Sequence, residues 1–314
     1  MTEVSSELLP ARERLSRRIL WLMRALAGDP MAVAATIWLL IVAIAIVADT
    51  LSLLGDNRIS LKARNLPPFD FDQSWTLWLG ADALGRPLLV RLVQAASTTV
   101  GIALATVLTS LVGGTLLGVV AGYFGGMIGN LIMRVSDIIL GFPTLLVALF
   151  GLYLFGPSVM NLVLVLAITR MPAYIRVARA ETLEVRERLF VDAARVFGGG
   201  PIWILRIHIL PSVAPTMLTL ASVNLAMVML FESGLSYIGL GIQPPAVSWG
   251  LMVAQGQGYL SSAWWLGFFP GLAVMLTTMS FNLLANWFRI VNDPSQRWRL
   301  ASRRRCGSPG NHRP

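Results

Sequence analysis

Six apolar stretches, each about as long as a membrane-spanning helix, dominate this 314-residue sequence. A helix that crosses a lipid bilayer needs about 20 mostly apolar residues. The six stretches cover residues 31–54, 98–124, 138–155, 159 to beyond Arg170, 213–240 and 264–288. We therefore expect an all-α integral membrane protein with six transmembrane helices.

The composition excludes the main alternatives to a membrane protein. Apolar residues make up 55% of the chain and charged residues 13%, whereas soluble domains carry roughly 25% charged residues. So few charges cannot cover the surface of a soluble enzyme, and a disordered chain needs a lower apolar content. The single cysteine, Cys306, excludes an internal disulfide framework.

The distribution of basic residues predicts the orientation of the chain in the membrane. With six spans both termini lie on one side, and that side holds 20 of the 25 Lys and Arg residues. The other five lie between Arg58 and Arg91. Cytoplasmic loops are enriched in Lys and Arg, so we expect both termini in the cytoplasm. The same enrichment explains the formal net charge of +9 without a nucleic-acid partner.

The spans divide the chain into four parts. Residues 1–30 form a cytoplasmic N-terminal segment, and residues 31–97 form the first transmembrane helix and an external, periplasmic loop. Residues 98–290 form a five-helix core with a cytoplasmic loop at 181–211, and residues 291–314 form a cytoplasmic tail. Residues 8–26 have one apolar helical face, which is typical of a helix on the inner membrane surface and also fits a solvated basic leader.

Several kinds of catalytic site are absent from the sequence. The only lysine, Lys62, follows Leu61, so the chain has no Gly-Lys-Ser/Thr phosphate loop. The two histidines, His208 and His312, are too few for a metal site built from histidine. No Gly-x-Ser-x-Gly nucleophile turn occurs. We therefore expect a transport or assembly role, with no cofactor or metal bound by this chain.

The loop between the fourth and fifth stretches has the pattern of a helical elbow. Residues 181–197 read as helix and end at Gly198–Gly200, which permit a sharp turn. Pro201 suits the first turn of a second helix, and we expect Pro211 to end or kink that helix. Such an elbow would project into the cytosol, where it could dock a soluble partner protein.

This segment resembles the coupling loop of ABC-transporter permeases. The family pattern is Glu-Ala-Ala, three residues, Gly, nine residues and Ile-x-Leu-Pro. Here Asp192 replaces the glutamate and His208 replaces the isoleucine at the same spacing. The resemblance implies that the residues at the motif positions couple the chain to an ATPase; they are Asp192, Ala193, Ala194, Gly198, His208, Leu210 and Pro211.

Other motifs resemble one branch of that family, the dipeptide, oligopeptide and nickel permeases. The matching segments are Leu79-Gly80-Ala81-Asp82 with Gly85-Arg86, Ala121-Gly122-Tyr123-Phe124-Gly125-Gly126, Gln243-Pro244-Pro245 with Ser248-Trp249-Gly250, and Phe269-Pro270-Gly271. The branch has an aspartate where this chain has Pro87 and Gly129, and a Gly-Asp pair where it has Ala285-Asn286. Together the segments resemble the second permease subunit of that branch and span about residues 29–294.

The resemblance implies a fold, a function and a set of partners. The fold is that of a type I ABC importer permease in a bacterial inner membrane, and the function is ATP-driven import of dipeptides or oligopeptides. The partners are a second, different permease, cytoplasmic ATPase subunits that use ATP and Mg²⁺, and a periplasmic or lipid-anchored substrate-binding protein. An importer of nickel, opines or another small solute is the alternative within the class, and a non-transporting membrane scaffold is the alternative outside it.

Glu232 and Arg170 interrupt the later apolar stretches, where ionisable groups are costly and mark functional candidates. Glu232 could line the translocation pathway or gate, or it could make a structural hydrogen bond. Arg170 could line the pathway or extend its side chain to the membrane interface. Three tryptophans, Trp249, Trp264 and Trp265, are expected in a belt at the outer interface.

Overall fold

The computed structural model describes residues 26–52 and 59–292. The expectations for residues 1–25 and 293–314, namely the basic leader, most of the C-terminal tail and Cys306, lie outside the described residues. The division of the chain into four parts stays a prediction.

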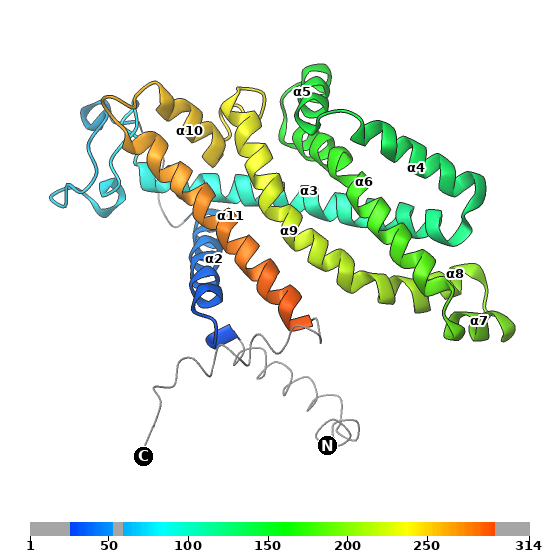
Figure 1. The fold of residues 1–314 in the computed structure, drawn as a ribbon. Helices are drawn as coiled ribbons and strands as arrows, with labels where there is room; N and C mark the ends of the chain where they lie inside the picture. Colours follow the sequence, from blue (N-terminus) through cyan, green and yellow to red (C-terminus); the bar gives the residue numbers. More distant parts are fainter. Residues whose placement is uncertain (1–25, 53–58, 293–314) are drawn as a thin grey trace, which may run out of the picture.

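The described residues form helices joined by short loops and one longer segment, residues 59–87 (Figure 1). The sequence predicts that this segment is external, and we call the end of the molecule that holds it the external end. In order, the helices are α2 (Pro30–Thr50), η1 (Leu61–Ala63), η2 (Trp75–Leu77), α3 (Leu88–Phe124), α4 (Gly126–Leu140), α5 (Thr144–Phe155), α6 (Val159–Arg186), α7 (Leu189–Val196), α8 (Pro201–Ile204), the π-helical turn η3 (Leu205–Ile209), α9 (Leu210–Tyr237), α10 (Trp249–Gln257) and α11 (Trp265–Asn292). Within residues 26–52 and 59–292 no β-strand forms, and the only strand-like contact is a bridge between Ala81 and Pro87.

Among the residues that the structure describes, five helices are long and apolar enough to cross a membrane: α2, α3, α6, the continuous helix Pro201–Tyr237 and α11. The expected third span, 138–155, is not one helix. It contains the end of α4 and all of α5, which meet at an angle of 91°. Pro143 causes the break, because it has no N–H to donate and disfavours helical geometry at Phe142 before it. Six spans result only if α4 and α5 count as one bent span.

A second difference concerns the start of α3. The apolar stretch predicts a start at residue 98, but the helix begins ten residues earlier, at Leu88. Arg91 and Gln94 lower the apolar content of this first part without weakening its helix propensity. The first part of α3 therefore belongs to the external end of the molecule.

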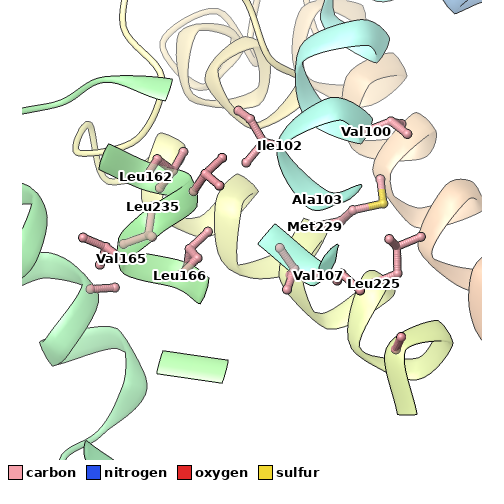
Figure 2. Packing of buried hydrophobic residues seen from close by; sticks show 14 of the residues in the cluster. Val100, Ile102, Ala103, Val107, Leu162, Val165, Leu166, Leu225, Met229 and Leu235 are labelled. Carbon is pink, nitrogen blue, oxygen red and sulfur yellow. The ribbon is translucent and has the colours of Figure 1, made fainter. Parts of the chain in front are cut away.

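The core forms where α3 crosses α6 and α9 (Figure 1). Apolar side chains from the three helices point toward one another there (Figure 2), among them Ile102 and Val107 of α3, Leu166 of α6, and Met229 of α9. α11 packs against α2, α9 and α10. This framework holds the external loops at one end of the molecule and α7 and α8 at the other.

A row of glycines brings α3 and α6 into close contact. A Cβ atom added at Gly114 would lie 2.5 Å from Tyr174 Cβ, and one at Gly118 would lie 2.6 Å from Ala178 Cβ. Gly122 meets α6 in the same way one turn further on. Small residues let helices in membranes approach closely, and these three glycines form such a packing surface between α3 and α6.

The expected tryptophan belt is wrong for two of its three members. Trp249 and Trp265 are 3% and 6% exposed. Their indole N–H groups donate to backbone carbonyls inside the protein, Trp249 to Leu92 at 2.9 Å and Trp265 to Ala81 at 3.4 Å. Trp249 thus fixes α10 to α3, and Trp265 fixes the segment around Ala81 to α11, while Trp264 is exposed.

Candidate functional site

The elbow forms as a short helix, a glycine turn and a second helix. α7 ends at Val196 with Phe197 as its C-cap, and Gly198 has a φ of +83°, a conformation that glycine adopts without strain. The amide of Gly199 then donates to the carbonyl of Ala194 at 2.9 Å, which closes the helix end. Gly200 returns to an extended conformation, and Pro201 begins α8. The predicted turn at the glycines is therefore confirmed.

The second helix of the elbow does not stop where the sequence suggests. Pro211 lies within a continuous helix that runs from Pro201 to Tyr237. The π-helical turn Leu205–Ile209 comes immediately before α9. In a π-helical turn each backbone N–H bonds to a carbonyl five residues earlier instead of four. This change of pairing comes directly before Pro211, whose nitrogen has no hydrogen to donate. Of the two expected effects of Pro211, an end of the helix is wrong, because the elbow continues without a break into a membrane-spanning helix.

The acidic position of the motif lies on the exposed side of α7. Asp192 forms an ion pair with Arg195 at 2.9 Å. Arg188 pairs with Glu184 instead, at 2.7 Å. Ala193 is exposed, and Ala194 is buried against the rest of the elbow. The carboxylate of Asp192 is accessible, with one arginine beside it.

His208 packs inside the bend of the elbow. Its ring centroid lies 5.0 Å from that of Trp203 and 5.7 Å from that of Phe190. Its Nε2 atom is buried without a hydrogen-bond partner among the described residues. A pocket of about 560 Å³ lies here, lined by Phe190, Ala193, Ala194, Phe197, Gly198, Gly199, Gly200, Trp203 and His208. Leu210 follows on the same helix and packs against the core.

Large apolar side chains cover the outer surface of the elbow. Phe197 is 90% exposed and Leu189 is 86% exposed, and Val196 and Ile202 are nearly as accessible. α7 and α8 lie at the end of the molecule away from the external loops (Figure 1), and these exposed side chains form an apolar patch on them. Such patches mark interaction sites.

Glu232 belongs to α9 and Arg170 to α6, and the two side chains have different partners. Glu232 is fully buried; its carboxylate accepts hydrogen bonds from Ser236 Oγ at 2.8 Å and Ser233 Oγ at 3.3 Å. Ser236 Oγ in turn accepts from the amide of Ile242, in the loop before α10. Arg170 is half-buried, and its guanidinium carbon lies 4.2 Å above the Phe231 ring. The structure does not bring the two charges into an ion pair.

A charged cluster at the external end of the molecule was missed by sequence reasoning. The Oδ2 atom of Asp82 accepts from Arg86 Nε at 2.7 Å and from Arg91 Nη1 at 2.8 Å. Arg91 Nη2 donates to Gln255 Oε1 of α10 at 3.0 Å. We call Asp82, Arg86, Arg91 and Gln255 the external clamp. Asp82 and Arg86 stand in the Gly80-Ala81-Asp82 and Gly85-Arg86 segments that resemble family motifs. Their opposite charges, four residues apart, are the sequence signal for this ion pair.

The clamp changes the acidity of its carboxyl group. Burial raises the pKa of Asp82, but hydrogen bonds from Arg86 and the positive charges of Arg91 and Arg86 lower it by more. The net effect places the pKa of Asp82 below its ordinary value. The clamp therefore holds a permanent negative charge between two arginines and ties the external loop to α3 and α10.

Comparison with known proteins relates this fold and elbow to a transport family. Residues 114–298 match the family described as "Binding-protein-dependent transport system inner membrane component". The chain is 34% identical over 297 residues to the probable D,D-dipeptide transport system permease protein DdpC of Escherichia coli, covering 94% of this chain and 97% of that protein. It is 37% identical over 216 residues to the di/tripeptide transport system permease protein DppC of Pseudomonas aeruginosa, covering 69% and 71%.

A solved structure shares the fold. A chain of the MetNI methionine ABC transporter, solved in inward-facing conformations, superposes with a TM-score of 0.51 at 17% sequence identity. The match covers 64% of this chain and 98% of that chain. The expected fold, an all-α permease of the type I ABC importer class, is thus confirmed. The chain belongs to the family of inner-membrane components of binding-protein-dependent transport systems, and within that family it is a DppC-like ABC permease.

Proposed function

We propose that the chain is one of two permease subunits of an ATP-driven importer that moves dipeptides or oligopeptides into a bacterial cell. The observation that carries this proposal is the elbow on a membrane protein of this family. A scaffold that transports nothing needs no such projection, whereas a permease must receive movement from an ATPase.

The apolar patch of the elbow supports docking of a cytoplasmic ATPase. Leu189 and Phe197 expose most of their surface, and covering apolar surface releases about 25 cal/mol per Å². Asp192 adds an accessible carboxylate beside the patch, although an exposed ion pair contributes only about 0–1 kcal/mol. In this proposal the ATPase covers Leu189, Phe197 and the bend around His208, and Asp192 orients it.

The continuous helix from Pro201 to Tyr237 supports transmission of movement. One end of this helix forms part of the elbow, and the other end, at Tyr237, leads into the loop before α10 (Figure 1). When ATP closes the ATPase pair, displacement of the elbow tilts the helix and changes access from one side of the membrane to the other. ATP and Mg²⁺ bind to the ATPase subunits in this scheme, and this chain carries no catalytic residue.

The peptide substrate is proposed from the names of the relatives, which include a di/tripeptide and a D,D-dipeptide permease. A substrate-binding protein would deliver the peptide to the external end.

The basic residues favour cytoplasmic termini. Labelling of Ser74→Cys but not Ser295→Cys by an impermeant thiol reagent in intact cells tests this orientation, in a background where Cys306 is replaced by serine. Labelling of the cysteine at position 295 would contradict it.

Reconstitution tests the transport proposal. The chain is purified with its second permease and ATPase subunits, placed in liposomes and supplied with ATP, binding protein and a radiolabelled dipeptide. We expect uptake that requires ATP and every subunit, and no ATP hydrolysis by this chain alone. Uptake of Ni²⁺ or an opine, but not of peptide, would show that the importer carries that solute instead of peptides. Complete absence of transport with all subunits present would favour the non-transporting scaffold.

A further inference from the structure

Arg170 places a positive charge deep inside a membrane-spanning helix. It follows Val159, the first residue of α6, by eleven residues, which is about 17 Å along the helix axis. The hydrocarbon core of a bilayer is about 30 Å thick, and α6, with 28 residues, is long enough to cross it with Arg170 near the middle of the helix. A charge at this depth is costly and normally faces a partner or a water-filled cavity.

No carboxylate within residues 26–52 and 59–292 forms an ion pair with Arg170. Its Nε and Nη2 atoms are buried without hydrogen-bond partners there. The guanidinium stacks on Phe231 of α9 at 4.2 Å, which holds the group in place through a cation–π contact. The stack leaves the positive charge without a compensating negative charge.

Polar groups continue from Arg170 toward the cytoplasmic end. Tyr174 lies one turn further along α6, and its hydroxyl lies beside the side chain of Asn224 on α9. Arg170, Tyr174 and Asn224 therefore form a polar row between two otherwise apolar helices. Arg170 is the most accessible of the three, because it is half-buried while Tyr174 and Asn224 are buried.

We propose that Arg170 binds the carboxylate of the substrate as it passes through the membrane. This inference rests on the proposed peptide transport. Every peptide with a free C-terminus carries a carboxylate, and the planar donor fork of arginine matches that group. A carboxylate would supply acceptors for the unpaired N–H donors of Arg170 and a negative charge beside its guanidinium.

The position of Arg170 against α9 favours a transient ligand over a fixed acidic partner from the second permease. Phe231 belongs to the same continuous helix that begins in the elbow at Pro201. Movement of the elbow would therefore shift the ring that holds the guanidinium. A site that changes with the ATPase cycle suits a group that binds and leaves, whereas a permanent ion pair needs no such link.

The test compares a dipeptide with its C-terminal amide in the reconstituted complex. Each is supplied at a concentration that saturates the binding protein, so the ratio of the two uptake rates reports on the permease. We expect Arg170→Gln to lower uptake of the free acid about tenfold, the size expected for loss of one charge-assisted hydrogen bond, and to leave uptake of the amide nearly unchanged. Arg170→Lys retains the charge and should keep most of the discrimination.

Arg176→Gln is the matched control, because Arg176 lies on the same helix but has an acidic partner, Asp137, at 2.7 Å. It should not change the ratio of acid to amide uptake. An unchanged ratio in Arg170→Gln would overturn the inference while peptide transport by the wild type stands. Failure of Arg170→Gln to assemble with the second permease, with Arg170→Lys assembling normally, would also overturn it and assign the counter-charge to that subunit. A wild-type complex that moves no peptide would refute the proposed function itself.

Discussion

Replacing Asp82 by asparagine should destabilise the external end of the protein strongly. Asparagine keeps the shape of the side chain but removes the negative charge shared by Arg86 and Arg91. Arg91 is only 5% exposed, so it would be left as a buried cation without a counter-charge. Removing one partner of a buried ion pair typically costs about 3–5 kcal/mol. At about 2–4 °C per kcal/mol for chains of roughly this size, the Tm should fall by about 6–20 °C.

The assay is thermal unfolding of the detergent-purified protein, with Asp72→Asn as the control. Asp72 lies exposed in the same external loop and forms no ion pair among the described residues, so its replacement should change the Tm by less than about 2 °C. Equal Tm values for Asp82→Asn and Asp72→Asn would refute the reasoning, because they would show that the clamp does not stabilise the fold.

The pH dependence of the same experiment follows from the lowered pKa of Asp82. In the unfolded chain an aspartate has a pKa of about 3.9. A carboxyl group whose pKa is lowered by folding stabilises the protein above the unfolded value, and this contribution is lost as the pH falls through the folded value. The difference in Tm between wild type and Asp82→Asn should be constant from pH 8 to 5 and shrink below about pH 4.

Three further predictions test the other sites. Glu232→Ala should lower the free energy of unfolding by about 1–3 kcal/mol, because the Ser236 O–H loses its acceptor. Glu232→Gln should lower the Tm less. A normal Tm with lost uptake would place Glu232 in the pathway instead. Gly118→Leu should lower the free energy of unfolding by about 1–3 kcal/mol through overpacking against α6. Gly101→Leu is the control and should leave the Tm unchanged, because nothing lies within 4 Å of an added Cβ there. Equal effects of the two substitutions would contradict close packing. Asp192→Ala should weaken ATPase pull-down less than about fivefold because its ion pair is exposed, and complete loss would show that the carboxylate dominates docking.

The helical architecture could be predicted from the sequence because apolar length alone decides whether a helix can span a bilayer. The glycine turn at Gly198 was predictable for the same kind of local reason, since few residues other than glycine tolerate a positive φ. Local reasoning failed at Pro143 and Pro211. One proline breaks a helix and the other is accommodated after a π-helical turn, and this difference depends on packing around the helix.

The external clamp and the buried tryptophans could not be predicted because they depend on distant contacts. Arg91 and Gln255 are separated by 164 residues, and their pairing follows from how α3 and α10 pack. Tryptophan is a residue type enriched at membrane interfaces, but the indole N–H of Trp249 donates to the carbonyl of Leu92 inside the protein. For Glu232 the sequence left a pathway role and a structural role open, and its hydrogen bonds to Ser233 and Ser236 favour anchoring the loop before α10.

The most direct test of the coupling proposal compares the same substitution at two glycines of the elbow. Gly198 has a φ of +83° and Gly200 a φ of −69°, and an added Cβ would meet nothing within 4 Å at either position. Valine is therefore strained at position 198 by the backbone alone and is tolerated at position 200. The measurement is pull-down of the partner ATPases together with peptide uptake. The coupling proposal predicts that Gly198→Val loses docking or uptake with normal membrane insertion while Gly200→Val retains both; full docking and uptake in Gly198→Val would contradict it.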